Sequence, residues 1–227
     1  IGNTTFSVSV VDNNASISAS TNSFSVADAP LNGGALTPPS AVEGTAFGPV
    51  TVFRFIDTDP NGASSDYVAT VATGDGATLT SAGNPGNVSI LPDPLHGGFL
   101  VKLSYTYAEE LTNATFSVSV KDHEAAVSAS TSAFNVADAP LTAGDLTLPG
   151  ATEGLSFGPL TVFHFTDADV LGTTADYVAT VVTGDGTTLT STANPDNVSI
   201  VANPAGGFDV KLTYAYTEEL TNATFSV

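Results

Sequence analysis

Oxygen-bearing side chains alternate along the segment DTDPNGASSD, which begins at position 57. Asp57, Asp59, Asn61 and Asp66 offer carboxylate and amide oxygens, and Gly62 allows the chain to turn among them. Calcium binds about six to eight such oxygens in a flexible geometry, so a turning loop with alternate acidic residues can supply several ligands. The segment therefore predicts a candidate calcium site.

A second copy of this segment keeps Asp167, Asp169 and Asp176 but has Leu171 where the first copy has an asparagine. The lost oxygen donor weakens any site that this loop could form alone. In a sandwich of the strand order expected below, this loop lies where the preceding linker enters. We therefore expect Asp138 of the linker to lie beside Asp167 and Asp169 and to complete a calcium site at the junction between neighbouring domains.

Further acidic residues are expected at the pole of the preceding domain that faces the same junction, namely Glu43, Asp75, Glu109 and Glu110. A cation held there would fix the angle between neighbouring domains. The alternative is that these loops are solvated and that their Asp and Asn residues serve only the turns, where short polar side chains bond to the nearby backbone. Both interpretations stay open at this point.

No arrangement of residues predicts catalysis. The turn formed by Gly74, Asp75 and Gly76 lacks the lysine and the following helix of a phosphate-binding loop. The three histidines share no spacing that would suggest a transition-metal site. Glu109 and Glu110 are adjacent and would point to opposite faces of a strand, unlike the paired carboxylates of glycosidases. We therefore expect no enzymatic activity and no cofactor other than calcium.

The charge of the chain excludes two classes of partner. Four Lys and Arg residues face 23 Asp and Glu residues among 227, which gives a formal net charge of −19. Nucleic-acid binding requires a positive surface, and an anionic membrane would repel this chain. The apolar stretches are too short and too often interrupted to cross a bilayer. We expect neither nucleic-acid binding nor membrane insertion.

The elements that must position the acidic loops are set by an internal repeat. The hexapeptide VADAPL occurs at 26–31 and again at 136–141, and 23 of 36 residues are identical between 51–86 and 161–196. These segments share a period of 110 residues. A repeat of this length is typical of tandem domains, each built from one set of secondary-structure elements.

Within one repeat, apolar residues alternate with polar ones, as strands require. Phe99, Val101, Leu103 and Tyr105 share one face of the segment GGFLVKLSYTY, with Lys102 on the other. Gly, Pro, Asn and Asp separate such segments. We expect the inward residues of these strands to be buried, namely Phe53, Phe55, Tyr67, Val71, Val101, Leu103, Phe116 and Val118, and likewise the equivalent Phe163, Phe165, Tyr177 and Val181. About seven short strands in a repeat of this length predict an all-β fold of tandem immunoglobulin-like β-sandwiches. The expected strands are 35–38, 47–57, 66–72, 77–80 with 87–90, 98–107, 114–121 and 127–137.

The run FRFIDTDPNG, DYVATVATGDG and LSYTYAEELTNATFSVSVKDHEA resembles polycystic-kidney-disease-type repeats. The chain is also similar to the cadherin-like repeats of giant bacterial surface proteins. The pattern departs from the first family at Val71 and Val181, which stand near the place where that family has a tryptophan. The resemblance implies extracellular spacer or adhesion modules without catalysis, and a bacterial cell surface as their location.

The repeat is out of phase with the chain. We expect 1–31 to be the C-terminal strands of a preceding repeat, 32–141 a complete repeat, and 142–227 a repeat that lacks its last strands. Neither partial repeat could close its own sandwich. The missing strands would come either from the same polypeptide, in a long covalent array, or from a neighbouring copy by strand exchange. We favour the covalent array at this stage, and both arrangements join repeats or copies head to tail.

These observations predict an extracellular structural protein that forms, or belongs to, a filament, a fibre or the stalk of a long surface adhesin. The alternative is a module that binds carbohydrate or another surface through its loops. Binding modules usually present exposed aromatic residues or one long irregular loop. Here the aromatic residues occupy inward strand positions and the loops are short and similar in both copies, which favours the structural interpretation.

Overall fold

The computed structural model describes residues 5–227, and these form two compact units. The described part of the first unit comprises 5–38, Pro49–Leu103 and Phe116–Thr131, and the second comprises Pro39–Gly48, Ser104–Thr115 and Ser132–Val227. The elements are antiparallel strands and one 3₁₀ turn, η1 (Ser64–Asp66), with no α-helix among the described residues. No described element could cross a bilayer as an apolar helix. The predicted all-β class is confirmed.

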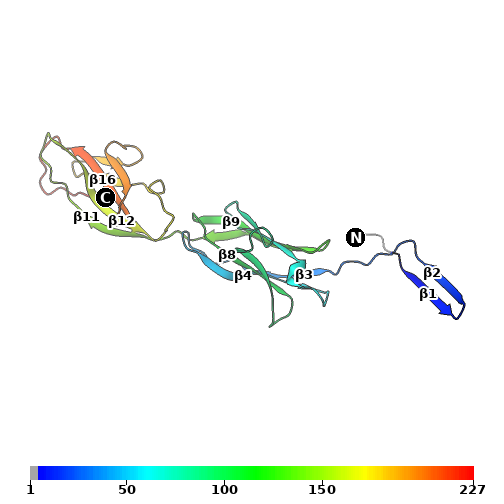
Figure 1. Ribbon diagram of the computed structural model, residues 1–227. Coiled ribbons are helices and arrows are strands. Elements are labelled where there is room, and N and C mark those ends of the chain that lie inside the picture. The colour runs from blue at the N-terminus through cyan, green and yellow to red at the C-terminus, as the bar shows by residue number, and fades with distance from the viewer. Residues whose placement is uncertain (1–4) are drawn as a thin grey trace. The chain divides into compact units, whose positions relative to one another are not determined.

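Eight strands follow one another between positions 31 and 136. Four form the sheet β3-β4-β8-β7 and four the sheet β10-β9-β5-β6, the two layers of a sandwich that is drawn in cyan to green in Figure 1. Their bounds are β3 (Leu31–Leu36), β4 (Phe47–Asp57), β5 (Val68–Ala72), β6 (Thr78–Thr80), β7 (Val88–Pro92), β8 (Phe99–Tyr105), β9 (Leu111–Lys121) and β10 (Ala126–Val136).

Alternation places the apolar side chains of these strands in the core. Phe55 of β4 packs on Phe99 of β8 with ring centroids 5.3 Å apart, and Tyr67 lies edge-on to Phe55 at 5.0 Å. Tyr67 directly precedes β5, so the ring contacts join the two sheets. All eight residues of this repeat expected in the core are buried: Phe53, Phe55, Tyr67, Val71, Val101, Leu103, Phe116 and Val118.

The strands after position 141 repeat this arrangement in part. One sheet has the order β11-β12-β16-β15, in which β12 and β16 lie side by side (Figure 1), and β13 pairs only with β14. Val162, Val181, Val198 and Leu212 form part of the core between the two sheets. The bounds are β11 (Leu141–Leu146), β12 (Ser156–Asp167), β13 (Thr180–Val182), β14 (Thr188–Thr190), β15 (Val198–Ala202) and β16 (Phe208–Ala215).

The segment before position 31 contains a two-stranded hairpin. β1 (Ser7–Asp12) pairs with β2 (Ala15–Ser20), with Val8 opposite Ala19 and Val10 opposite Ile17. Every residue of both strands is exposed. The hairpin therefore carries the alternating pattern of a core strand without a layer to cover it.

The structure departs from the predictions in two strands and in the burial of two side chains. The first strand of the repeat is Leu31–Leu36 rather than 35–38. The segments 77–80 and 87–90, predicted together, form strands in opposite sheets, because the turn around Asn84 moves the chain from one layer to the other. Phe163 and Tyr177 were expected in the core but are only half-buried, since no further strand covers this side of the β13 sheet among the described residues.

A Phe116→Ala substitution should lower the free energy of unfolding by about 3–5 kcal/mol, because it removes a fully buried aromatic ring. Phe6 has the same sequence neighbours but is exposed, so Phe6→Ala is the matched control and should cost less than about 1 kcal/mol. Urea denaturation of the two variants at low protein concentration measures the difference. Equal losses would contradict the assignment of Phe116 to the core.

Candidate functional site

Acidic loops surround a cavity of about 310 Å³ that lies wholly within the second compact unit. Two loops contribute its glutamates: the loop between β3 and β4 holds Glu43, and the turn between β8 and β9 holds Glu109 and Glu110. The segment after β10 contributes Asp138. The segment after β12 adds Asp169, and the full acidic lining is Glu43, Glu109, Glu110, Asp138, Asp167, Asp169 and Asp176.

Glu43 ties its loop to the segment that follows β10. Its backbone N–H donates to the carbonyl of Ala137 at 3.0 Å, and its Oε1 accepts from the N–H of Ala139 at 3.0 Å. Val42 forms a parallel bridge to Ala137 beside it. These bonds hold a carboxylate at a place where only 6% of the residue is exposed.

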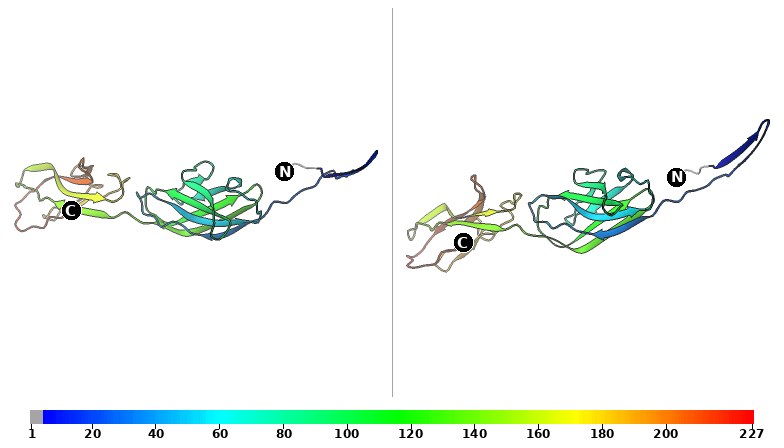
Figure 2. Two further views of the ribbon diagram at one scale, coloured as in Figure 1. Left: turned by 60° about the horizontal axis from the view of Figure 1, so that its bottom comes forward. Right: turned by 90° about the horizontal axis from the view of Figure 1, so that it is seen from below.

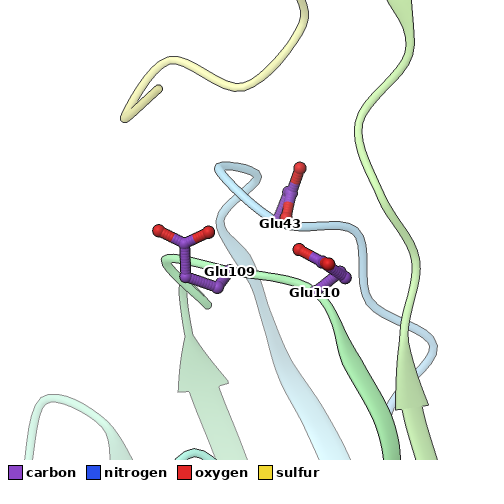
Figure 3. Close-up of side chains that lie close together, drawn as sticks. All are labelled: Glu43, Glu109 and Glu110. Carbon is purple, nitrogen blue, oxygen red and sulfur yellow. The ribbon is translucent and has the colours of Figure 1, made fainter. Parts of the chain in front are cut away.

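The second oxygen of Glu43 has no hydrogen-bond partner although it is buried. One oxygen from each of Glu43, Glu109 and Glu110 lies within 4.8 Å of the others, and Figure 3 shows the three carboxylates approaching one another from two loops. Unsatisfied buried carboxylate oxygens are rare, because losing hydration without a replacement bond is costly. A proton, a water molecule or a cation would satisfy this oxygen.

The electrostatics of the cluster agree with this requirement. Burial raises the pKa of Glu43 above its ordinary value of 4.5, and the hydrogen bond from the Ala139 N–H opposes the rise. The close side-chain contact with Asp138 adds to the rise, followed by the charges of Asp138 and Glu110. The charge of Asp176 raises the pKa of Glu109, with smaller contributions from burial, Glu110 and Asp169. Neighbouring carboxylates thus make it harder for Glu43 and Glu109 to ionise.

Gly44 allows the glutamate loop to approach the aspartate loop. It has a φ of +64°, and a Cβ at this position would collide with the carboxylate of Asp169. Its N–H donates to the carbonyl of Tyr107 at 2.9 Å, which anchors the turn. Glycine tolerates both the positive φ and the close contact.

The predicted residues of the first acidic loop lie elsewhere, in the first unit. Asp57 accepts from the N–H of Asp59 at 2.8 Å and, through its other oxygen, from the hydroxyl of Tyr67 at 2.8 Å. Asp59 accepts from the N–H of Asn61, and Asp66 from the N–H of Ala63. These side chains serve the turn, which is the role that the alternative interpretation assigned to them.

The second copy of this loop has the same turn bonds but also lines the acidic cavity. Asp167 accepts from the N–H of Asp169 at 2.8 Å and from the hydroxyl of Tyr177 at 2.8 Å. Asp176 accepts from the N–H of Thr173 at 2.6 Å. The structure thus gathers four of the eight predicted ligands, Asp138, Asp167, Asp169 and Asp176, around one cavity.

Glu43, Glu109 and Glu110 were expected near the junction but not among the calcium ligands. The signal that could have singled out Glu43 is the Glu-Gly pair, which recurs as Glu153 and Gly154 at the repeat period. Asp75, expected at the same pole, instead accepts from Thr73 and from the N–H of Ala77 in its own turn and does not line the cavity.

Without divalent cations, wild-type stability should fall as pH rises above 4.5. A raised pKa in the folded state means that the contribution of Glu43 is complete below 4.5 and is lost as pH rises through the folded value. Glu43→Gln keeps an acceptor for Ala139 but cannot ionise, so its melting temperature should exceed that of the wild type increasingly toward pH 7. Glu153→Gln, at the exposed counterpart, is the control. A constant difference from pH 4 to pH 7 would contradict the burial of an ionisable Glu43.

No family model matches the chain, and no curated protein matches it. Among solved structures, the chain is similar to one described as the crystal structure of the Protocadherin GammaB4 extracellular domain. That match covers 93% of this chain and 33% of the other, at 10% sequence identity and a TM-score of 0.28. The chain thus spans about a third of the length of that structure. A TM-score this low carries no argument about function, and the fold assignment depends on the strands described above.

Proposed function

We propose that this chain is a structural, adhesion-type module of the cell exterior, in which calcium bound in the acidic cavity stiffens the connection between one β-sandwich and the next. The observation that carries the proposal is the buried, unpartnered oxygen of Glu43 facing other carboxylates. A module of this kind would belong to a filament, a fibre or an adhesin stalk.

Calcium matches the donors around the cavity. Two oxygens bound to one ion at about 2.3–2.6 Å lie no more than about 5 Å apart, and the glutamate oxygens satisfy that limit at 4.8 Å. The donors are carboxylates from several loops in an irregular arrangement, which suits calcium better than the octahedral geometry of magnesium. Asp138 and Asp169 would approach the same ion from the segments after β10 and β12.

No basic side chain lines the cavity to neutralise these charges. Arg54 instead forms an ion pair with Asp93, and Lys211 lies 3.7 Å from Asp209. A cation from solution is therefore the partner that would let all of these carboxylates stay ionised near neutral pH. Calcium is abundant outside cells, which is the compartment that this function requires.

The second repeat has glutamates at the three equivalent positions. Glu153, Glu218 and Glu219 line a separate cavity of about 340 Å³. There Glu153 is exposed, whereas Glu43 is covered by the segment 137–139 that follows β10.

The proposal includes no catalytic activity. Tyr177 donates to Asp167 and the remaining carboxylates face one another, so no nucleophile is paired with a base in this cavity. The aromatic rings stack within the sandwiches rather than standing at the rim of a loop. These features favour a structural role over carbohydrate or surface binding.

Calcium should bind the full chain with a dissociation constant of about 0.1–1 mM, in the range of extracellular modules, and should raise its melting temperature. Glu43→Gln should weaken binding at least about tenfold, because it removes a charged ligand. The same variant should be more stable than the wild type in chelator and should gain little from calcium. Titration calorimetry and thermal denaturation measure both effects.

Asp59→Asn is the matched control for the loss of one acidic charge. Asp59 lies in the first loop, where its oxygen accepts a turn N–H that asparagine can also accept. Its calcium affinity should equal that of the wild type. An absence of heat at millimolar calcium, together with an unchanged melting temperature after chelation, would sink the proposal and leave the acidic loops as solvated turns.

A further inference from the structure

An apolar groove of about 440 Å³ runs along the second unit between β11 and the edge that leads into β13. One wall carries Leu141 and Ala143 of β11, with Phe163 of β12 behind them. The other wall is the backbone and side chains of 176–180. Leu141 and Val178 are largely exposed beside it. The groove therefore opens the core of this sandwich to solvent.

The middle repeat has a strand in the equivalent place. β9 pairs with β5 so that Val118 lies opposite Val71 and Val120 opposite Ala69, and all four side chains are fully buried. At the period of 110 residues, the groove edge residues Val181 and Ala179 correspond to Val71 and Ala69. The groove thus lies where β9 lies in the middle repeat, in a known register.

The second unit already shows the start of that strand. Ser226 bridges Val182 through hydrogen bonds of 2.9 and 3.1 Å, which reproduces the pairing of Ser117 with Ala72 in the middle repeat. Val227 then reaches the groove. Among the described residues of the second unit, no strand pairs with the edge from Thr180 back to Val178.

The β1–β2 hairpin has the sequence that fits this position. Thr5–Val10 is identical to the part of β9 that begins at Thr115. Its apolar face is exposed, to 50% at Val8, 58% at Val10 and 74% at Ile17. Figure 2 shows the dark-blue hairpin edge-on as a single layer. The residues that are buried in β9 are thus uncovered in the hairpin.

We propose that the β1–β2 hairpin of a second copy of this chain occupies the groove and completes the sandwich by strand exchange. In the register of β9, Ser9 of the donor lies opposite Thr180 and Val10 opposite Ala179. Backbone bonds along the edge supply affinity, and the alternate valines fill the apolar pockets. The contact joins two different surfaces, so it propagates head to tail into an open filament.

The second strand of the hairpin also has a matching position. In the middle repeat, Val127 of β10 lies over Gly33 of β3. The equivalent pair is Ile17 of the donor over Ala143, which lines the groove. The larger Ile and the added methyl of Ala143 fill the space that a Val and a Gly share in the middle repeat, so the donor strand must sit slightly farther out there.

The second unit also has a carboxylate that could accept hydrogen bonds from the backbone of the donor hairpin's turn. In the first unit, the carboxylate of Asp28 accepts from the N–H groups of Glu124 and Ala125 at 3.3 and 3.0 Å, which caps the β9–β10 turn. Asp138 is the counterpart of Asp28 at the repeat period, and it would cap the donor turn at Asn14 and Ala15 in the same way.

Two features remove obstacles to this exchange. The donor segment 5–26 carries one charged residue, Asp12, so the repulsion expected from a net charge of −19 is weak at the contact. Thr224–Val227 and Thr5–Val8 have the same sequence, TFSV. Replacing one by the other in the first positions of the strand leaves the buried side chains unchanged.

Disulfide trapping tests the register, and the chain has no cysteine to interfere. The full chain with Ser9→Cys and Thr180→Cys should form a ladder of covalent multimers on mild oxidation, because the two positions face each other across strands. Ser9→Cys with Val181→Cys shifts the pair by one residue and places the sulfurs on opposite faces, so it should form at least about tenfold less multimer. Equal yields, or a disulfide within one chain, would overturn the proposal.

Association of the full chain supplies a second readout. Sedimentation velocity should show the wild type growing with concentration, and Val10→Lys should weaken association more than about a hundredfold by placing a charge in an apolar groove. Val11→Lys is the control, since its position corresponds to the exposed Lys121 and should leave association unchanged. Both valines are exposed in the hairpin, so neither change should unfold it.

A wild type that stays monomeric at all concentrations, or two lysine variants that behave alike, would refute strand exchange. The measurements are made in chelator and again in calcium. Strand exchange requires no cation, so association in chelator tests it even if calcium does not bind. Calcium at Asp138 would compete with the donor turn for that carboxylate, so the measurement in chelator decides.

Discussion

An alternating β-strand is stable only when a second layer covers its apolar face, and this requirement governs the molecule. In the middle repeat, Val118 and Val120 of β9 complete that cover and are fully buried. In the second unit Phe163 and Tyr177 are half-buried and line an apolar groove together with Val227. Identical local sequences therefore have different burial, because burial is decided by whether the opposing strand is present.

Close packing at the loops imposes a second requirement, which is that buried carboxylate charge must be neutralised. Glu43 accepts from Ala139 and is drawn into a position where solvent no longer reaches its other oxygen. The chain has few basic side chains that could neutralise this carboxylate. Arg54 forms an ion pair with Asp93, and Lys211 forms one with Asp209. The acidic excess that keeps such a protein soluble becomes a destabilising force wherever loops converge. An external cation is the simplest way to relieve it.

Much of this arrangement could be predicted from the sequence, and the exceptions have physical reasons. Period-two alternation located nearly every strand, because side-chain direction is a local property of the chain. Burial of Phe163 was wrongly expected, since it depends on strands far away in sequence. Glu43 was not selected as a ligand, because its burial arises from the hydrogen bond to Ala139, 96 residues away. The composition of the loops identified them as acidic, but it could not show which of their carboxylate oxygens would be calcium ligands.

The exposed edge before β13 differs from the edges that soluble proteins usually present. Natural sheets protect such edges with inward charges, prolines or bulges, whereas this edge carries Val178, Ala179 and Thr180. A strand that slipped by one residue along it would turn serines toward the core and valines toward water. An unprotected edge beside an apolar groove thus both invites a strand and selects its register. The alternating serines and valines of β1 exclude a slip by one residue, and the correspondence with β9 places Val10 opposite Ala179.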